Sequence, residues 1–150
     1  VQLMTNGLIL RTNIIGQTLE NTTSFAEWVL KGLTYNTPLK LFYDVNFSPL
    51  HVYDLSLIIE KIINNPIFGV YHCVSSESIS KYDFGKKMAK IFQLPSSNIT
   101  RISIDVMNLG AKRPKNMALN CDKLSDNINY DLPKIVDSII RMKNQYHINL

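Results

Sequence analysis

The sequence is 150 residues long, with 45% hydrophobic and 19% charged residues. These proportions are typical of a globular chain with one modest core, and they exclude a disordered or fibrous protein. The formal net charge of +4 fits a ligand that carries phosphate, although many proteins with this charge bind nothing acidic.

Patterns in the first half of the chain predict strands and helices in alternation. The short apolar run at residues 7–10, which ends at Arg11-Thr12, is typical of a strand buried on both faces, as in a parallel sheet. A capping box of Ser24 and Glu27 predicts a helix that begins at residue 25. The next predicted segments are a strand at 39–43, a polar loop at 44–49 and a helix from about 53 to 64.

The second half continues the alternation. A second capping box, Ser80 and Asp83, predicts the start of a third long helix. The other predicted segments are strands at 68–74 and 99–104, a basic irregular stretch at 109–120, short helical turns from Cys121, and a last helix from about 132 to 146. Alternating strands and helices favour the α/β class, and no linker divides the chain into two independent domains.

Three helices carry apolar stripes that predict their buried faces. Trp28 lies on the stripe of the first helix, so we expect it in the core, with stacking against a sugar as the alternative. The stripe of the second helix predicts five buried side chains, those of Leu55, Ile58, Ile59, Ile62 and Ile63. The last helix has a similar stripe, which includes Ile135, Val136, Ile139 and Ile140.

Neither cysteine nor hydropathy patterns indicate an extracellular or membrane protein. Cys73 and Cys121 form no C-x-x-C pair, so we expect no disulfide framework and no zinc site. The segment Val1–Met4 lacks the features of a signal peptide, and no apolar run approaches the roughly 18 residues of a membrane span. We therefore expect a cytoplasmic protein with no membrane partner.

The usual motifs for cofactor or metal chemistry are missing from the sequence. It contains no glycine-rich phosphate loop of the G-x-G-x-x-G type, and its three histidines have no metal-ligand spacing. Tyr82 and Lys86 match Tyr-x-x-x-Lys, in which the lysine would favour the phenolate of the tyrosine for proton transfer. The alternative, which we favour, is that Tyr82 packs at a helix start while Lys86 is solvated.

Four motifs occur in an order and spacing that resemble the dTDP-4-dehydrorhamnose reductase family, a group of extended short-chain dehydrogenases that modify nucleotide-linked sugars. Each motif is short, but together they cover about residues 7–124. They are Ile9-Leu10-Arg11-Thr12 with Gly16, Ser48-Pro49-Leu50-His51-Val52 with Asp54, Gly69-Val70-Tyr71-His72 with Ser80, and Ala111-Lys112-Arg113-Pro114-Lys115-Asn116 with Leu119.

This resemblance implies a fold and a place in a larger enzyme. The fold would be α/β, namely the C-terminal strands of a Rossmann-type parallel sheet plus the small α/β substrate-binding domain. Residues 1–150 would form the substrate-binding C-terminal portion, without the N-terminal dinucleotide-binding half. The family's glycine-rich loop and catalytic Tyr-x-x-x-Lys would both precede Val1. NADP or NAD would then serve the full-length parent, and we expect neither cofactor to bind this chain alone.

Arg113 is the first candidate for a ligand-binding residue. A guanidinium can hold a diphosphate through two parallel hydrogen bonds, and the family places an arginine on the diphosphate in this segment. A surface arginine in a basic loop is the alternative. We expect Lys112 and Lys115 to be solvated neighbours that add positive potential.

Four further residues are expected to line the substrate site. Asn116 could bind the nucleotide or cap the following turn, and Asn13 and Asn46 lie in loops that face the sugar in relatives. His51 follows Pro49 on an extended segment, where a packed, hydrogen-bonded histidine is the competing interpretation.

Two functions and several partners follow from these expectations. The chain would be the substrate-binding part of an NAD(P)-dependent reductase of nucleotide-diphosphate sugars, not catalytic alone. The alternative is a non-catalytic sugar-nucleotide-binding or regulatory subunit of the same fold. The strands near residues 8–12 and 69–74 would pair in parallel, with an open edge that calls for the missing N-terminal half, a second subunit or a homodimer. No recognition motif indicates nucleic-acid binding.

Overall fold

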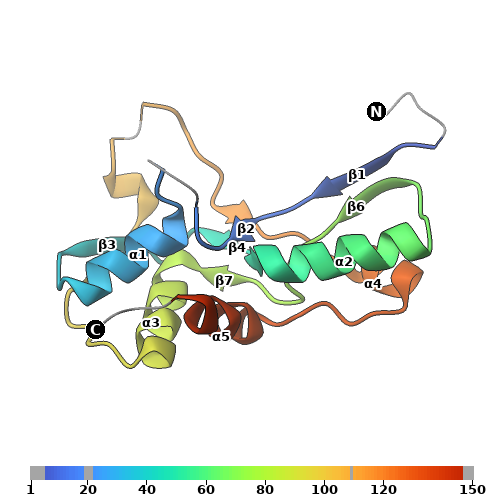
Figure 1. Ribbon diagram of the computed structural model, residues 1–150. Coiled ribbons are helices and arrows are strands. Elements are labelled where there is room, and N and C mark those ends of the chain that lie inside the picture. The colour runs from blue at the N-terminus through green and yellow to red at the C-terminus, as the bar shows by residue number, and fades with distance from the viewer. Residues whose placement is uncertain (1–5, 19–21, 109, 147–150) are drawn as a thin grey trace.

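A computed structural model of the protein describes residues 6–18, 22–108 and 110–146 (Figure 1). Within these ranges strands and helices alternate along the chain, which confirms the α/β class. The helices are α1 (Phe25–Thr34), α2 (Val52–Asn64), α3 (Lys81–Phe92), α4 (Asp122–Ile128) and α5 (Ile135–Gln145), with a 3-10 turn, η1 (Ile104–Val106). The strands are β1 (Leu8–Arg11), β2 (Ile14–Ile15), β3 (Leu39–Phe42), β4 (Asn46–Phe47), β5 (Leu50–His51), β6 (Gly69–His72), β7 (Ile79–Ser80), β8 (Ile99–Ile102) and β9 (Asn116–Met117).

The strands form small sheets in which parallel pairing dominates. β1 pairs with β6 in parallel, from Leu8 opposite Gly69 to Arg11 opposite His72, as the sequence predicts. β2 pairs with β5 and β3 pairs with β8, both in parallel. β4 is the central strand of the remaining sheet, antiparallel to β7 and parallel to β9.

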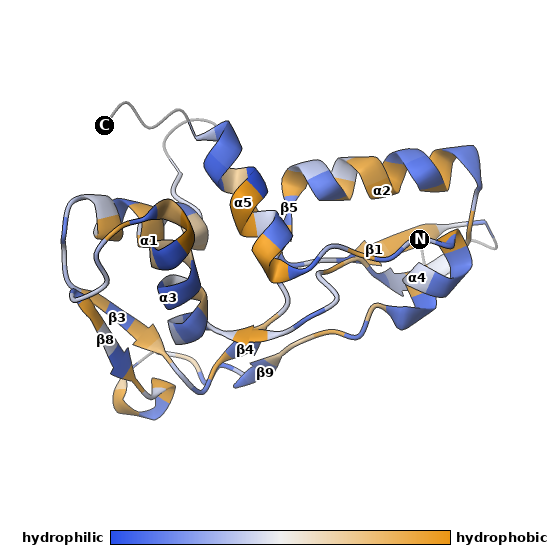
Figure 2. Ribbon diagram, turned by 90° about the horizontal axis from the view of Figure 1, so that it is seen from below, coloured by the Kyte–Doolittle hydropathy of each residue, from blue (hydrophilic) through white to orange (hydrophobic). Residues whose placement is uncertain are grey.

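Two hydrophobic clusters form the core, one at each end of the molecule (Figures 1 and 2). The first cluster packs α1, α3 and α5 against β3, with Val29, Leu39, Phe84 and Ile139 among its buried side chains. The second cluster packs α2 and α4 against β5 and β6, and it includes Leu50, Ile58, Tyr71 and Leu124.

Three expectations about strands and loops are wrong. β1 is not buried on both faces: Leu8 and Leu10 pack against the second cluster and are half-buried, while Ile9 belongs to neither cluster, because successive strand side chains point to opposite faces. The segment 44–49 is not a polar loop, because β4 is paired on both edges and Phe47, Ser48 and Pro49 are buried. β9 likewise lies inside the stretch predicted to be irregular.

Several apolar side chains predicted to be buried are exposed. In α2, Ile58 and Ile62 face the core, whereas Ile59 and Ile63 are 40% and 71% exposed because each lies about 100° around the helix from its buried neighbour. Ile140 of α5 is exposed for the same reason. Trp28 is 44% exposed, since α1 buries Ala26, Val29, Leu30 and Leu33 instead.

The helix starts follow their capping residues. The Ser24 hydroxyl accepts the Glu27 backbone N–H at 3.2 Å and the Glu27 carboxylate accepts that of Ser24 at 2.8 Å, which confirms the first capping box. At α3 the Ser80 hydroxyl accepts the Asp83 N–H at 3.0 Å but donates to the Asp83 carboxylate at 2.6 Å. α5 begins at Ile135, three residues later than predicted, because Pro133 disfavours helical geometry at Leu132.

A polar junction joins α5 to β5 and α2. The Asp54 carboxylate, 1% exposed, lies 2.7 Å from Nε of Arg141 and accepts the Ser138 hydroxyl at 3.4 Å. The same hydroxyl accepts the backbone N–H of His51 at 3.1 Å. Burial raises the pKa of Asp54, and the Arg141 guanidinium partly offsets that effect. The junction therefore depends on keeping the buried carboxylate paired.

Replacing Arg141 tests this dependence. Arg141→Leu leaves the Asp54 carboxylate buried without its cation, so the free energy of unfolding should fall by about 3–5 kcal/mol in urea titrations. The exposed Arg101→Leu is the matched control and should change it by less than about 0.5 kcal/mol. A loss no larger than that of the control would contradict the role given to the junction.

The Glu27 carboxylate connects the segment before α1 to the end of α5 through hydrogen bonds. Its carboxylate accepts the hydroxyl of Thr18 at 2.6 Å and that of Tyr146 at 2.8 Å, besides the Ser24 N–H. Burial on its own would raise the pKa of Glu27, but the hydrogen bonds from Thr18, Ser24 and Tyr146 outweigh it and lower the pKa to about 2.

Because of this shift, the free energy of unfolding depends on pH in the acid range. A depressed folded-state pKa stabilises the protein above the ordinary pKa near 4.5, and that stability is lost as the pH falls toward about 2. At neutral pH Glu27→Gln should lower the free energy of unfolding by about 2–3 kcal/mol, and the gap to the unmodified chain should close over this acid range. The exposed Glu60→Gln should show no such gap, and a gap for Glu27→Gln that stays constant with pH would refute the explanation.

Candidate functional site

The double pairing of β4 brings three distant segments together. Asn46 of β4 lies opposite Ser80 of β7 on one side and opposite Asn116 of β9 on the other. The backbone N–H of Lys81 donates to Val45 O at 3.0 Å. The start of α3, the segment before β9 and the β3–β4 connection therefore meet at one point, and two of the predicted site residues, Asn46 and Asn116, are adjacent.

Asp44 anchors the segment that carries Arg113. Its carboxylate accepts the Ser103 hydroxyl at 2.6 Å and the Ile104 N–H at 3.0 Å, and it lies 3.1 Å from Nζ of Lys115. The Ser103 hydrogen bond is the main cause that lowers the pKa of Asp44 to about 2. This carboxylate is thus ionised at neutral pH and ties both ends of the segment to the β3–β4 connection.

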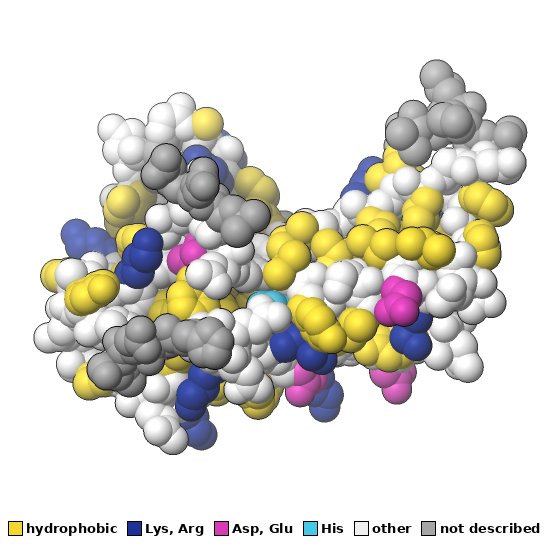
Figure 3. All heavy atoms as spheres, in the orientation of Figure 1, with side chains coloured by type: hydrophobic (Ala, Val, Ile, Leu, Met, Phe, Trp, Pro, Cys, Tyr) yellow, Lys and Arg dark blue, Asp and Glu magenta, His cyan; other side chains and the backbone are white. Residues whose placement is uncertain are grey.

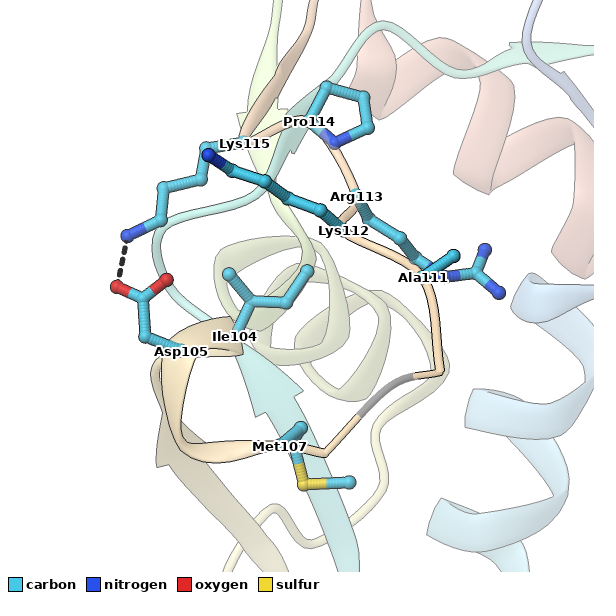
Figure 4. Close-up of a pocket in the computed structure, with 8 residues that line it drawn as sticks. All are labelled: Ile104, Asp105, Met107, Ala111, Lys112, Arg113, Pro114 and Lys115. Carbon is cyan, nitrogen blue, oxygen red and sulfur yellow. Dashed lines mark hydrogen bonds and ion pairs between the residues drawn. The ribbon is translucent and has the colours of Figure 1, made fainter.

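Lys115 is exposed, as the sequence suggested, but its positive charge is not free. Besides Asp44, it pairs with Asp105 (Figure 4), and both carboxylates raise its pKa. Its charge is therefore already balanced within the chain, because two carboxylates share one ammonium. Lys112 is exposed on the same segment.

Arg113 lies between two neighbouring pockets. The first, of about 480 Å³, is formed by η1 and the segment before β9, from Ala111 to Lys115 (Figure 4). The second, of about 370 Å³, has a mostly apolar wall that includes Phe25, Phe42 and Met117. The Arg113 side chain extends away from the Lys115–Asp105 pair, and it has no ion pair within the described ranges.

A third pocket, of about 430 Å³, adjoins the second because Phe25, Phe42 and Lys81 line both. Its other walls include Trp28, Pro38 and Met107. Arg113 and Lys81 are the two cations in the walls of the second pocket, and no carboxylate lines either the second or the third pocket. Sequence reasoning missed Lys81, although it directly follows the capping Ser80 and therefore had to lie at the helix start.

Of the five predicted site residues, Arg113 alone lines any of these three pockets, and Asn13, Asn46, His51 and Asn116 lie outside their walls. Asn13 contributes its carbonyl, which accepts the Leu50 N–H at 2.9 Å where β2 begins. His51 is 0% exposed and its Nδ1 accepts the Tyr53 N–H at 3.2 Å, so it caps α2 as a packed histidine. Burial lowers the pKa of His51, which keeps the ring neutral. His51 therefore has no access to a ligand in this chain, whereas Asn13 is half-buried and its contact with the sugar stays a prediction.

Tyr82 and Lys86 do not form a proton-transfer pair. Lys86 donates to the Ser96 hydroxyl at 2.6 Å, while Tyr82 is partly buried against the first cluster. The two side chains thus have different partners, although they share a helix face.

Residues 6–18, 22–108 and 110–146 hold neither a candidate metal site nor a candidate membrane span. In these ranges no three side chains of His, Cys, Asp or Glu gather as a metal site would require. No helix there has the length and hydropathy needed to cross a bilayer.

Nearly the whole chain matches a known protein family and the folds of solved structures. The family model for the RmlD substrate binding domain matches residues 1–148. Among solved structures, dTDP-4-dehydrorhamnose reductase from Bacillus anthracis, in complex with NADP, superposes with a TM-score of 0.81 at 23% identity, over 93% of this chain and 48% of that one. The dTDP-glucose 4,6-dehydratase of the same organism, in complex with NAD, has a TM-score of 0.72 at 13% identity, over 95% and 45% of the two chains.

Curated relatives match a shorter part. Methionine adenosyltransferase 2 subunit beta from Mus musculus is 35% identical over 81 residues, which is 51% of this chain and 24% of the relative. The Xenopus laevis protein of the same name is 36% identical over 81 residues. The chain thus spans about half the length of the solved structures, and its match covers about a quarter of these relatives. Because the family model matches nearly the whole sequence, the chain belongs to the RmlD substrate-binding domain family.

Proposed function

We propose that this chain is the substrate-binding part of an NAD(P)-dependent reductase of nucleotide-diphosphate sugars, similar to 4-dehydrorhamnose reductase, and that it is not catalytic alone. The observation that carries the proposal is the position of Arg113 between two pockets, on a segment anchored by Asp44. Membership of the substrate-binding family supports a ligand at this place.

The chemistry of the pocket suits a diphosphate. A guanidinium presents parallel N–H donors that match two phosphate oxygens, and Arg113 has no carboxylate partner in the described part of the chain. The carboxylates nearby, Asp44 and Asp105, are engaged by Lys115. Arg113 can therefore bind an anion without breaking an existing ion pair. We propose Asn46 and Asn116, which lie opposite each other in β4 and β9, as further substrate-binding residues.

The residues of this chain do not fit a dinucleotide cofactor. The sequence has no glycine-rich phosphate loop, and its two helical glycines serve packing: a Cβ at Gly32 would lie 2.4 Å from Leu39, and one at Gly85 would lie 2.3 Å from Leu41. A pyrophosphate needs free backbone at a glycine-rich turn before a helix, and neither site is of that kind. NADP or NAD would thus have to be held by a portion outside these 150 residues.

An exposed apolar surface suits such a portion or a second subunit. β1 is paired with β6 on one edge, and no described strand covers its other edge. Hydrophobic side chains form a band across this end of the molecule (Figure 3), and the exposed ones there include Ile59, Ile63 and Phe68. Open strand edges and apolar patches favour association with another chain.

A second candidate function rests on the curated relatives. They are named as a subunit of methionine adenosyltransferase 2, so this chain could serve as a non-catalytic sugar-nucleotide-binding or regulatory subunit in the cytoplasm. A reading frame that continues upstream through a glycine-rich strand-turn-helix and a Tyr-x-x-x-Lys would favour the reductase. An upstream frame without them would favour the subunit.

Self-association tests the proposed open edge. The 150-residue chain should form dimers or larger species at high concentration, because the β1 edge and its apolar surroundings lack a covering element. Light scattering over a concentration series measures this. A compact monomer at every concentration would contradict the proposal.

Removing the guanidinium tests the ligand site. Arg113→Ala should weaken binding of dTDP-glucose and UDP-glucose about tenfold or more in calorimetric titrations, because charge-assisted hydrogen bonds contribute about 1.5–3 kcal/mol. Lys112→Ala, which removes a neighbouring exposed cation, should have a much smaller effect. Equal effects of the two substitutions, or no binding by the unmodified chain, would remove Arg113 as the site.

A further inference from the structure

We propose that Lys81 is a second anion-binding residue of the same cleft, which takes the phosphate oxygens of a nucleotide together with Arg113. The identity of the ligand rests on the proposed function above, but the role of Lys81 as an anion-binding cation does not. Lys81 is the first residue of α3, and its position is fixed by the hydrogen bond from its backbone N–H to Val45 O, 3.0 Å long.

The ammonium of Lys81 is held over two aromatic rings. Its Nζ lies 3.4 Å from the centre of the Phe47 ring and 3.9 Å from that of Phe25. The two rings meet edge to face, with centres 5.7 Å apart. This cage fixes the ammonium at the boundary between the second and third pockets, both of which Lys81 lines.

The charge of Lys81 has no anionic partner in the described residues. The charged side chains that share its two pockets are Arg113 and Lys40, both cations. Burial lowers the pKa of Lys81 to about 8, and a cation in the first turn of a helix is also opposed by the helix dipole. The two aromatic rings attract the ammonium, but they do not neutralise its charge as an anion would.

A bound anion would supply the missing partner. Arg113 and Lys81 line the second pocket from different segments, and a diphosphate there could accept hydrogen bonds from both. The adjoining third pocket has a largely apolar wall with the exposed Trp28, Pro38 and Phe42, which suits a flat base. The arrangement fits a nucleoside diphosphate with its base in the third pocket and its phosphates between the two cations.

The substitution Lys81→Met tests the charge and keeps most of the side-chain packing. We expect Lys81→Met to weaken dTDP-glucose binding about tenfold in calorimetric titrations, and Lys81→Arg to retain most of the affinity. Thymidine, which has no phosphate, should bind both variants as it binds the unmodified chain. Lys90→Met removes an exposed lysine of the same helix that lines neither pocket and is the matched control, with an expected change of less than about twofold. Thermal unfolding of each variant checks that the fold is kept.

The dependence on pH separates a binding role from a structural one. Between about pH 7 and about pH 9 Lys81 loses its proton, so the affinity of the unmodified chain for dTDP-glucose should fall several-fold. The diphosphate of this probe is esterified at both ends and does not titrate there, and Arg113 remains charged. The same fall in Lys90→Met, together with its loss in Lys81→Met, would support the proposal. An unchanged affinity and pH profile in Lys81→Met would overturn it.

Pyrophosphate distinguishes the two proposals. If the unmodified chain binds pyrophosphate in a manner that depends on Lys81, but binds neither dTDP-glucose nor UDP-glucose, the proposed function fails and the anion site stands. If the sugar nucleotides bind and only Arg113→Ala weakens them, the proposed function stands and the role of Lys81 is wrong. If none of these probes binds, both are wrong.

Discussion

Strand β4 pairs on both of its edges, although it is only two residues long, and the candidate site depends on this pairing. Asn46 lies opposite Ser80 on one side and Asn116 on the other, so the start of α3 and the end of the Arg113 segment are fixed to the same short piece of backbone. Asp44, two residues before Asn46, fixes the start of that segment through Ser103 and Ile104. A cleft built from three distant parts of the chain is thereby held together by a few hydrogen bonds.

The candidate site lies apart from the polar junction that connects the two clusters. Asp54, Ser138 and Arg141 connect α5 to α2 and β5, and His51 caps α2 beside them. The Arg113 and Lys81 pockets lie instead against α1 and β3, at the other end of the molecule from the open β1 edge. An added N-terminal portion or a partner subunit could therefore cover β1 while the pocket mouths stay accessible, which suits either of the two proposed functions.

Much of the fold follows from local patterns. The Ser24–Glu27 capping box, the start of α3 after Ser80 and the parallel pairing of β1 with β6 were all predictable, since each depends on neighbouring residues or on the resemblance. Side-chain exposure was less predictable: a stripe of five residues on α2 does not reveal that Ile58 and Ile62 are buried and Leu55 partly buried, while Ile59 and Ile63 are exposed. The site was predicted only in part. Asn46 and Asn116 meet, whereas His51 became a helix cap and Lys81 was missed, because cation–π contacts and two-residue strands leave no periodic signal.

The central claim is that the surface around Arg113 and Lys81 binds a nucleotide-diphosphate sugar. A nuclear magnetic resonance titration of the isotope-labelled chain with dTDP-glucose tests it most directly, because each backbone amide reports its own surroundings. The account predicts saturable shifts concentrated in residues 42–47, 80–84 and 110–117, with little change in α2 and α4. Shifts confined to α2, α4 and β1, or none at saturating ligand, would contradict it.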